Sequence, residues 1–98
     1  MKKTIQFEGF TCHIEYLKYQ NTNRTAIQLL DATEGDPVAM ATINMPEVKL
    51  EENEVIIKDY SENEGILDVL ISEGIVERTG KTVSTGFVTC QICKLLNK

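Results

Sequence analysis

Apolar and polar residues alternate along the first half of the chain with a period of two, which is the pattern of β-strands with one buried face. A short alternating run around Ile5 and Phe7 is followed, after Gly9, by a longer one, and together they predict an antiparallel hairpin. Polar or proline-containing turns separate the further predicted strands, which cover residues 25–31, 38–43 and 54–58.

The C-terminal part of the chain predicts two more strands. The first covers residues 75–79, the dipeptide Gly80-Lys81 predicts a turn, and a final strand covers residues 87–96. This last strand has apolar residues at both even and odd positions, which is typical of a strand covered on both faces. We therefore expect it to lie in the interior of its sheet.

The stretch that precedes these last strands predicts one amphipathic helix. Ser61 and Glu64 have the spacing of a capping box, in which the serine oxygen accepts a hydrogen bond from the Glu64 backbone. Gly74 supplies the residue that adopts the left-handed conformation at the end of many helices. We predict a helix from about Glu62 to Glu73 that packs on one face of the sheet.

These elements predict an α+β fold with a mainly antiparallel β-sheet of about five to seven strands. The 98 residues can bury roughly 60 to 65% of the surface of the unfolded chain, so we predict a single globular domain over residues 1–98. The N-terminal residues contain two lysines but no long apolar run behind them. We therefore expect neither a secretory signal nor a membrane span, and we predict a cytoplasmic protein.

One long segment of the sequence resembles a known family. It reads IKDYSENEGILDVLISEGIVERTGKTVSTGFV, with DPVAMATINMP before it and CKLL near the end, and its most specific parts are residues 59–65 and 85–88. From about Ala26 onward, the chain resembles a family of small uncharacterised proteins found on phages, plasmids and conjugative elements of Gram-positive and gut bacteria. The family is a domain of unknown function. The resemblance therefore implies a mobile-element setting in bacteria, and it supplies no activity and no catalytic residues.

The cysteines suggest a metal or redox site, but their spacing argues against both. Cys90 and Cys93 form a C-x-x-C, which with Cys12 and His13 would supply four zinc ligands. In a strand, positions 90 and 93 point to opposite faces, as do neighbours 12 and 13, so neither pair converges. A thioredoxin-like site needs a helix after the C-x-x-C, and none is predicted there. We predict three buried, reduced cysteines, no metal site and no cofactor.

Other catalytic patterns are also incomplete. Gly80-Lys81-Thr82 resembles the end of a phosphate-binding loop, but that motif requires glycine at position 75, which is Ile75, and a helix after the threonine. The single histidine, His13, alternates with apolar neighbours, and this places it on the solvated face of a predicted strand. We therefore predict no catalytic residues, and an enzyme is the less favoured alternative.

Acidic residues concentrate between positions 47 and 77, where ten carboxylates accompany two lysines, in a chain with a net charge of −5. No basic stripe with interleaved aromatic residues is present, and direct binding to nucleic acid is disfavoured. The simplest interpretation is that this charge keeps the protein soluble. The functional interpretation is that five carboxylates at a predicted turn and the nearby helix start form one negative rim that contacts a partner: Glu51, Glu52, Glu54, Glu62 and Glu64.

Two hypotheses about function follow from the sequence. The preferred one is a small cytosolic protein-interaction or accessory module of a mobile genetic element, present as a monomer or homodimer, that binds a basic host or element protein. A sharper form of it is an acidic mimic that occupies the nucleic-acid groove of a host enzyme. The alternative is a small enzyme or ligand-binding domain with a pocket formed by the sheet and the helix. A deep cleft containing His13, Tyr60 or the cysteines would favour this alternative.

Overall fold

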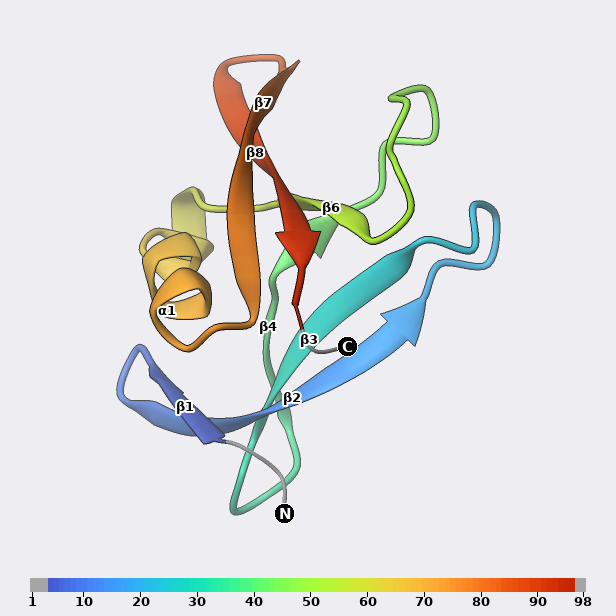
Figure 1. Cartoon of the computed structure of the whole chain (residues 1–98). Helices are drawn as coiled ribbons and strands as arrows, with labels where there is room; N and C mark the ends of the chain where they lie inside the picture. The colour runs from blue at the N-terminus through green and yellow to red at the C-terminus, as the bar shows by residue number, and fades with distance from the viewer. Residues whose placement is uncertain (1–3, 97–98) are drawn as a thin grey trace.

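A computed structural model describes residues 4–96 and contains eight strands in two four-stranded antiparallel sheets, with one α-helix (Figure 1). This confirms the predicted α+β class, with one strand more than the upper end of the predicted range and with the strands divided between two sheets rather than one. The first sheet has the order β1-β2-β3-β4 and the second has the order β5-β6-β8-β7. The elements are β1 Thr4–Phe7, β2 Phe10–Lys18, β3 Thr25–Asp31, β4 Pro37–Met40, β5 Thr42–Ile43, β6 Glu54–Ile57, a 3₁₀ turn η1 Ser61–Asn63, α1 Ile66–Ser72, β7 Val76–Thr85 and β8 Val88–Leu95.

The two sheets meet at Ala41, which separates β4 from β5. The backbone N–H of Ala41 donates to the carbonyl of Ile27 in the first sheet (2.8 Å). The Ala41 carbonyl accepts from the N–H of Lys58, at the end of β6 in the second sheet (2.8 Å). The single strand predicted over residues 38–43 is therefore two short strands joined by a corner. The predicted hairpin is confirmed, and β3 has the predicted bounds.

The helix packs against β1 and β7 (Figure 1). Its buried residues, Ile66, Leu67 and Leu70, join the main apolar core that lies between the two sheets. The glycine stop is confirmed, because Gly74 has a φ of 74° and the N–H of Ile75 donates to the Leu70 carbonyl (2.9 Å). This pattern is the Schellman ending of a helix.

The predicted start of the helix is wrong. Ser61 has a φ of 58° and lies in η1, and the α-helix begins four residues after the predicted Glu62, at Ile66. The side chain that satisfies the first backbone donors is Asp59, whose Oδ1 accepts from the N–H of Gly65 (2.9 Å) and of Leu67 (3.1 Å). A carboxylate closer to the end of β6 therefore takes the capping role that the S-x-x-E spacing assigned to Ser61.

The predicted turn at Gly80-Lys81 is also wrong, because β7 continues through it with a bulge. The Thr79 hydroxyl fills the gap in the ladder, since it donates to the carbonyl of Ile92 (2.7 Å) and accepts from the N–H of Lys81 (3.1 Å). The chain reverses instead at Gly86 and the residue after it. Gly86 has a φ of 69°, which suits the glycine position of a type II′ hairpin.

Strand β8 lies between β6 and β7, which confirms the expectation of an interior strand. Cys93 and Leu95 on one face of β8 belong to the main core. Cys90 and Ile92 on the other face form a smaller apolar cluster with Ile56 of β6. The loop between β5 and β6 covers this smaller cluster, and that loop carries the candidate site.

Candidate functional site

Residues 44–53 connect β5 to β6, and we call this segment the acidic loop. Its outer surface carries the exposed carboxylates of Glu47, Glu51 and Glu52, together with the exposed ammonium of Lys49. Three negative charges and one positive charge give the segment a net charge of −2. The loop therefore presents negative charge to the solvent at one end of the molecule.

The inner surface of the acidic loop is apolar and fixed to the second sheet. Met45, Val48 and Leu50 are half-buried and pack against the smaller cluster on the outer face of that sheet. Alternation of inward apolar and outward charged residues along the loop thus produces one packed side and one solvated side. The packing gives the loop a defined conformation without regular secondary structure.

Arg24, at the end of the β2–β3 turn, holds the loop from the first sheet. Its Nη1 donates to the carbonyl of Met45 (2.9 Å), and its Nη2 donates to the carbonyl of Val48. The planar guanidinium suits this task, because it presents several donors in a rigid fork. Asn44 adds two side-chain hydrogen bonds to the same turn, accepting from Thr22 Oγ1 (3.1 Å) and donating to Asn21 Oδ1 (2.8 Å).

Glu54 anchors the other end of the loop. One oxygen of its buried carboxylate accepts from the N–H of Glu51 (2.8 Å), and the other lies 2.6 Å from Lys81 Nζ on β7. Burial alone would raise the pKa of Glu54, but the hydrogen bonds from Lys81 and from Glu51, with the charge of Lys81, lower the pKa below its ordinary value. Glu54 is therefore ionised and structural.

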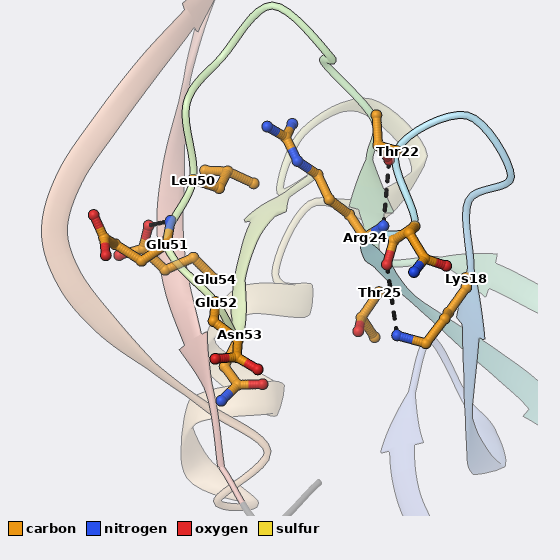
Figure 2. Close-up of a pocket in the computed structure, with 10 residues that line it drawn as sticks. Lys18, Thr22, Arg24, Thr25, Leu50, Glu51, Glu52, Asn53 and Glu54 are labelled. Atoms are coloured by element: carbon orange, nitrogen blue, oxygen red, sulfur yellow. Dashed lines mark hydrogen bonds between the residues drawn. The ribbon is translucent and has the colours of Figure 1, made fainter.

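A cleft of about 380 Å³ separates the acidic loop from the β2–β3 turn (Figure 2). Its walls are mainly polar, with Lys18 and Arg24 on one side and Glu51, Glu52 and Glu54 on the other. Arg24 and Glu54 are committed to the contacts described above, and Lys18 makes only a long hydrogen bond to the carbonyl of Asn23 (3.5 Å). The exposed groups of Lys18, Glu51 and Glu52 can therefore meet a ligand. Such an arrangement can hold a polar or charged group.

The five predicted contact residues do not form one rim. Glu51 and Glu52 lie together on the acidic loop, whereas Glu54 is buried beneath it. Glu62 and Glu64 are exposed after the other end of β6, near the start of the helix (Figure 1). A second, shallower groove of about 410 Å³ lies there, lined by Glu62 among others.

Glu62 is also engaged locally, because it forms an i,i+4 ion pair with Lys58. The hydrogen bond from Lys58 is the main reason why the pKa of Glu62 falls to about 2. Two residues that the sequence did not single out, Arg24 and Glu47, contribute more to the acidic loop than Glu62 does. The only feature of the sequence that could have pointed to Arg24 is its position at the end of a polar turn.

The residues that would have marked an enzyme site lie elsewhere. The three cysteines are free and buried, with Cys90 and Cys93 on opposite faces of β8, as predicted. Burial raises the pKa of all three thiols, that of Cys93 to about 11. His13 is half-buried rather than solvated, and its Nδ1 is buried without a hydrogen-bond partner among the described residues. Neither cleft described above is lined by these side chains.

Comparison of the chain with models of protein families, with curated proteins and with solved structures finds no match. Within residues 4–96, no helix has the length and apolar character required to cross a membrane.

Proposed function

We propose that this chain is a small protein-binding module whose acidic loop contacts a basic surface on a partner protein. The observation that carries the proposal is the way the loop is held. Its backbone is fixed by Arg24 and Glu54, while Glu47, Glu51 and Glu52 remain exposed. Charge is thus presented on an ordered segment, and ordered segments lose less conformational entropy on binding than flexible ones.

Electrostatic attraction is the expected mode of recognition. Exposed carboxylates steer a basic partner during the diffusional encounter and raise the association rate, more so at low ionic strength. The side chains of Glu51 and Glu52 border the cleft, so a lysine or arginine of the partner can enter it between these carboxylates and the turn. Lys18, on the opposite wall, then disfavours a second cation and contributes to specificity.

The proposed setting follows from the sequence. We propose an accessory protein of a bacterial mobile element, in keeping with the family that the chain resembles from about Ala26 onward. A cytoplasmic location agrees with three free cysteines, because disulfides are rare in reducing compartments. The sharper proposal, an acidic mimic of nucleic acid, requires the partner to use the same basic groove for DNA or RNA.

Matched variants test the proposal. Glu51→Gln/Glu52→Gln removes two charges from the acidic loop, and Glu34→Gln/Asp36→Asn removes two exposed charges from the β3–β4 turn. The parent and both variants are immobilised and exposed to lysate of a host bacterium, and the captured proteins are quantified by mass spectrometry. The proposal expects a basic protein that the parent and the turn variant retain and that the loop variant loses. Equal recovery by all three would refute a role of the acidic loop.

The cleft itself favours the second candidate, a ligand-binding domain. Its volume of about 380 Å³ lies at the lower end of the usual range for small-molecule sites, although such sites are mostly apolar and this one is mainly polar. A charged metabolite that binds there would shift the amide resonances of Lys18, Asn23 and Asn53 together. Screening a panel of charged metabolites by ¹H–¹⁵N correlation spectra distinguishes this candidate from protein binding, because a ligand site responds without any partner protein.

A further inference from the structure

Near the β7–β8 hairpin tip, the outer edge of β7 is a strand edge that no described element covers. β7 is the last strand of its sheet, and it has ten residues. α1 packs against β7, with the ion pair between Arg78 and Asp68 (3.7 Å) linking the helix to the strand before the bulge. The hairpin tip extends beyond the helix (Figure 1). Within residues 81–85, the backbone groups that do not bond to β8 therefore face the solvent, which is the usual template for pairing with another strand.

Beyond the bulge, residues 82–85 lack the usual protection of such an edge. Natural edges carry proline, an outward lysine or a short strand, and residues 82–85 contain neither proline nor charge. Lys81, the residue just before this segment, is drawn across the face of the sheet by Glu54, with 2.6 Å between its Nζ and a carboxylate oxygen. The salt bridge that anchors the acidic loop thus also directs Lys81 away from the edge, where its charge would oppose pairing with another strand.

Hairpin geometry identifies the residues that face outward. Thr85 and Val88 pair across the two-residue turn, and in such hairpins this closing pair is hydrogen-bonded. Because hydrogen-bonded and non-bonded pairs alternate, Val83 also bonds to β8, whereas Thr82 and Ser84 direct their N–H and C=O groups toward the free edge.

We propose that this edge pairs with the same edge of a second copy of the chain, antiparallel and centred on Val83. In this register Thr82 of one copy faces Ser84 of the other, and the outward groups of both residues are satisfied on each side of the two-fold axis. Lys81 faces Thr85 of the second copy, so no like charges are opposed. If the centre moves to Thr82, Ser84 of each copy faces Gly80 of the other. If it moves to Ser84, Thr82 of each copy faces Gly86.

The side chains also favour this register. Val83 is half-buried and packs at the border of the apolar cluster that contains Cys90 and Ile92. In the dimer, Val83 lies directly opposite its counterpart as a non-hydrogen-bonded pair, in which side chains approach most closely. The two clusters then become continuous across the axis. The same register brings the fully exposed Phe87 of each copy beside the bulge at Gly80 of the other.

Two five-residue strand segments form an interface below the standard size, so the dimer is expected to be weak and to depend on concentration. Sedimentation velocity from micromolar to millimolar concentrations should show the mean mass rising toward twice that of the chain. A monomeric mass over the whole range would overturn the proposal.

Charge variants on the edge test the register. Thr82 and Ser84 are both exposed, so substituting them leaves the fold of the monomer intact. Thr82→Lys/Ser84→Lys opposes two pairs of like charges and should weaken the dimer about tenfold. Thr82→Lys/Ser84→Glu opposes unlike charges in the same register and should strengthen it. Equal dissociation constants for these two variants would place the contact elsewhere on the molecule.

A cross-linking pair tests the two-fold axis. Val83→Cys places two thiols directly opposite each other, within the distance that a disulfide requires. Thr85→Cys lies on the same face of the strand, but its counterpart is about 13 Å away in this register. The native cysteines are buried and do not compete. Mild oxidation should give a covalent dimer with Val83→Cys only. Equal cross-linking by both variants indicates random collision and would refute the register, and so would cross-linking by Thr85→Cys alone.

Discussion

Removing the Asp59 carboxylate is expected to destabilise the protein, because one oxygen of this side chain satisfies two backbone donors at the start of α1. The N–H groups of Gly65 and Leu67 lie 2.9 and 3.1 Å from Asp59 Oδ1. In Asp59→Ala the N–H of Gly65, an exposed residue, can turn to water, whereas the N–H of Leu67 belongs to a buried residue and finds no equivalent partner. The helix also loses a negative charge near its N-terminus.

The loss of a capping carboxylate of this kind costs about 1 to 2 kcal/mol of unfolding free energy. In a domain of this size, 1.5 kcal/mol corresponds to a fall in the melting temperature of roughly 6 to 12 °C. The assay is denaturant titration and thermal unfolding, followed by circular dichroism. Asp59→Asn keeps the acceptor oxygen and loses only the charge, so its midpoint should lie between those of the parent and Asp59→Ala.

Ser61→Ala is the matched control. Ser61 is exposed and lies in η1, so its replacement should change the unfolding free energy by less than about 0.5 kcal/mol. A neutral Asp59→Ala, or a loss in Ser61→Ala as large as that in Asp59→Ala, would refute the assignment of the cap.

Three further predictions concern the packed groups around the acidic loop. Lys81→Met leaves the buried carboxylate of Glu54 without its cation and should cost about 2 kcal/mol at pH 7. Because the pKa of Glu54 is lowered in the folded state, the ionised carboxylate contributes to stability above pH 4.5, and this contribution is lost as the pH falls below that value. In urea titrations, the stability of Lys81→Met should therefore depend less on pH in this acid range than that of the parent. Burial raises the pKa of Cys93 to about 11, so this thiol should not react with a disulfide reagent at pH 8 until the protein unfolds. Arg24→Gln removes both guanidinium contacts with the loop, and amide exchange in residues 44–53 should become at least severalfold faster while exchange in β8 is unchanged.

Features of the fold that depend on local patterns could be predicted from the sequence. The polar loop before residue 25 and the turn after residue 31 delimit β3, and apolar residues on both faces of β8 indicate an interior strand. The glycine that ends the helix also acts locally, since the conformation it adopts is available to few other residues. These signals depend on neighbours in sequence, and distant parts of the chain do not override them.

The features that were predicted wrongly depend on contacts between residues that are distant in sequence. The hydroxyl of Thr79 carries β7 through Gly80 by bonding to Ile92, a partner on the next strand. The burial of Glu54 follows from its pairing with Lys81, which no spacing reveals. Two side-chain acceptors, Asp59 and Ser61, lie within three residues before the helix. Asp59 acts as the cap because the end of β6 places its carboxylate there, and the S-x-x-E pattern does not reveal this.

The candidate site could be predicted only in part for the same reason. The density of carboxylates identified Glu51 and Glu52, which are exposed on one loop. The grouping with Glu62 was wrong, because Glu51 and Glu52 lie before β6 and Glu62 lies after its other end. The role of Arg24 could not be predicted, because its contacts with the loop join two sheets whose arrangement the sequence does not specify.

The most direct test of the proposed function is the binding of a captured partner to Arg24→Gln, measured by surface plasmon resonance at low and moderate salt. This variant makes the chain more acidic by one charge and leaves Glu47, Glu51 and Glu52 in place. If the ordered loop is the contact, Arg24→Gln should bind about tenfold more weakly than the parent despite its added negative charge, because the loop must then be ordered on binding. Binding as tight as that of the parent, or tighter, would show that overall negative charge rather than the ordered acidic loop determines the interaction.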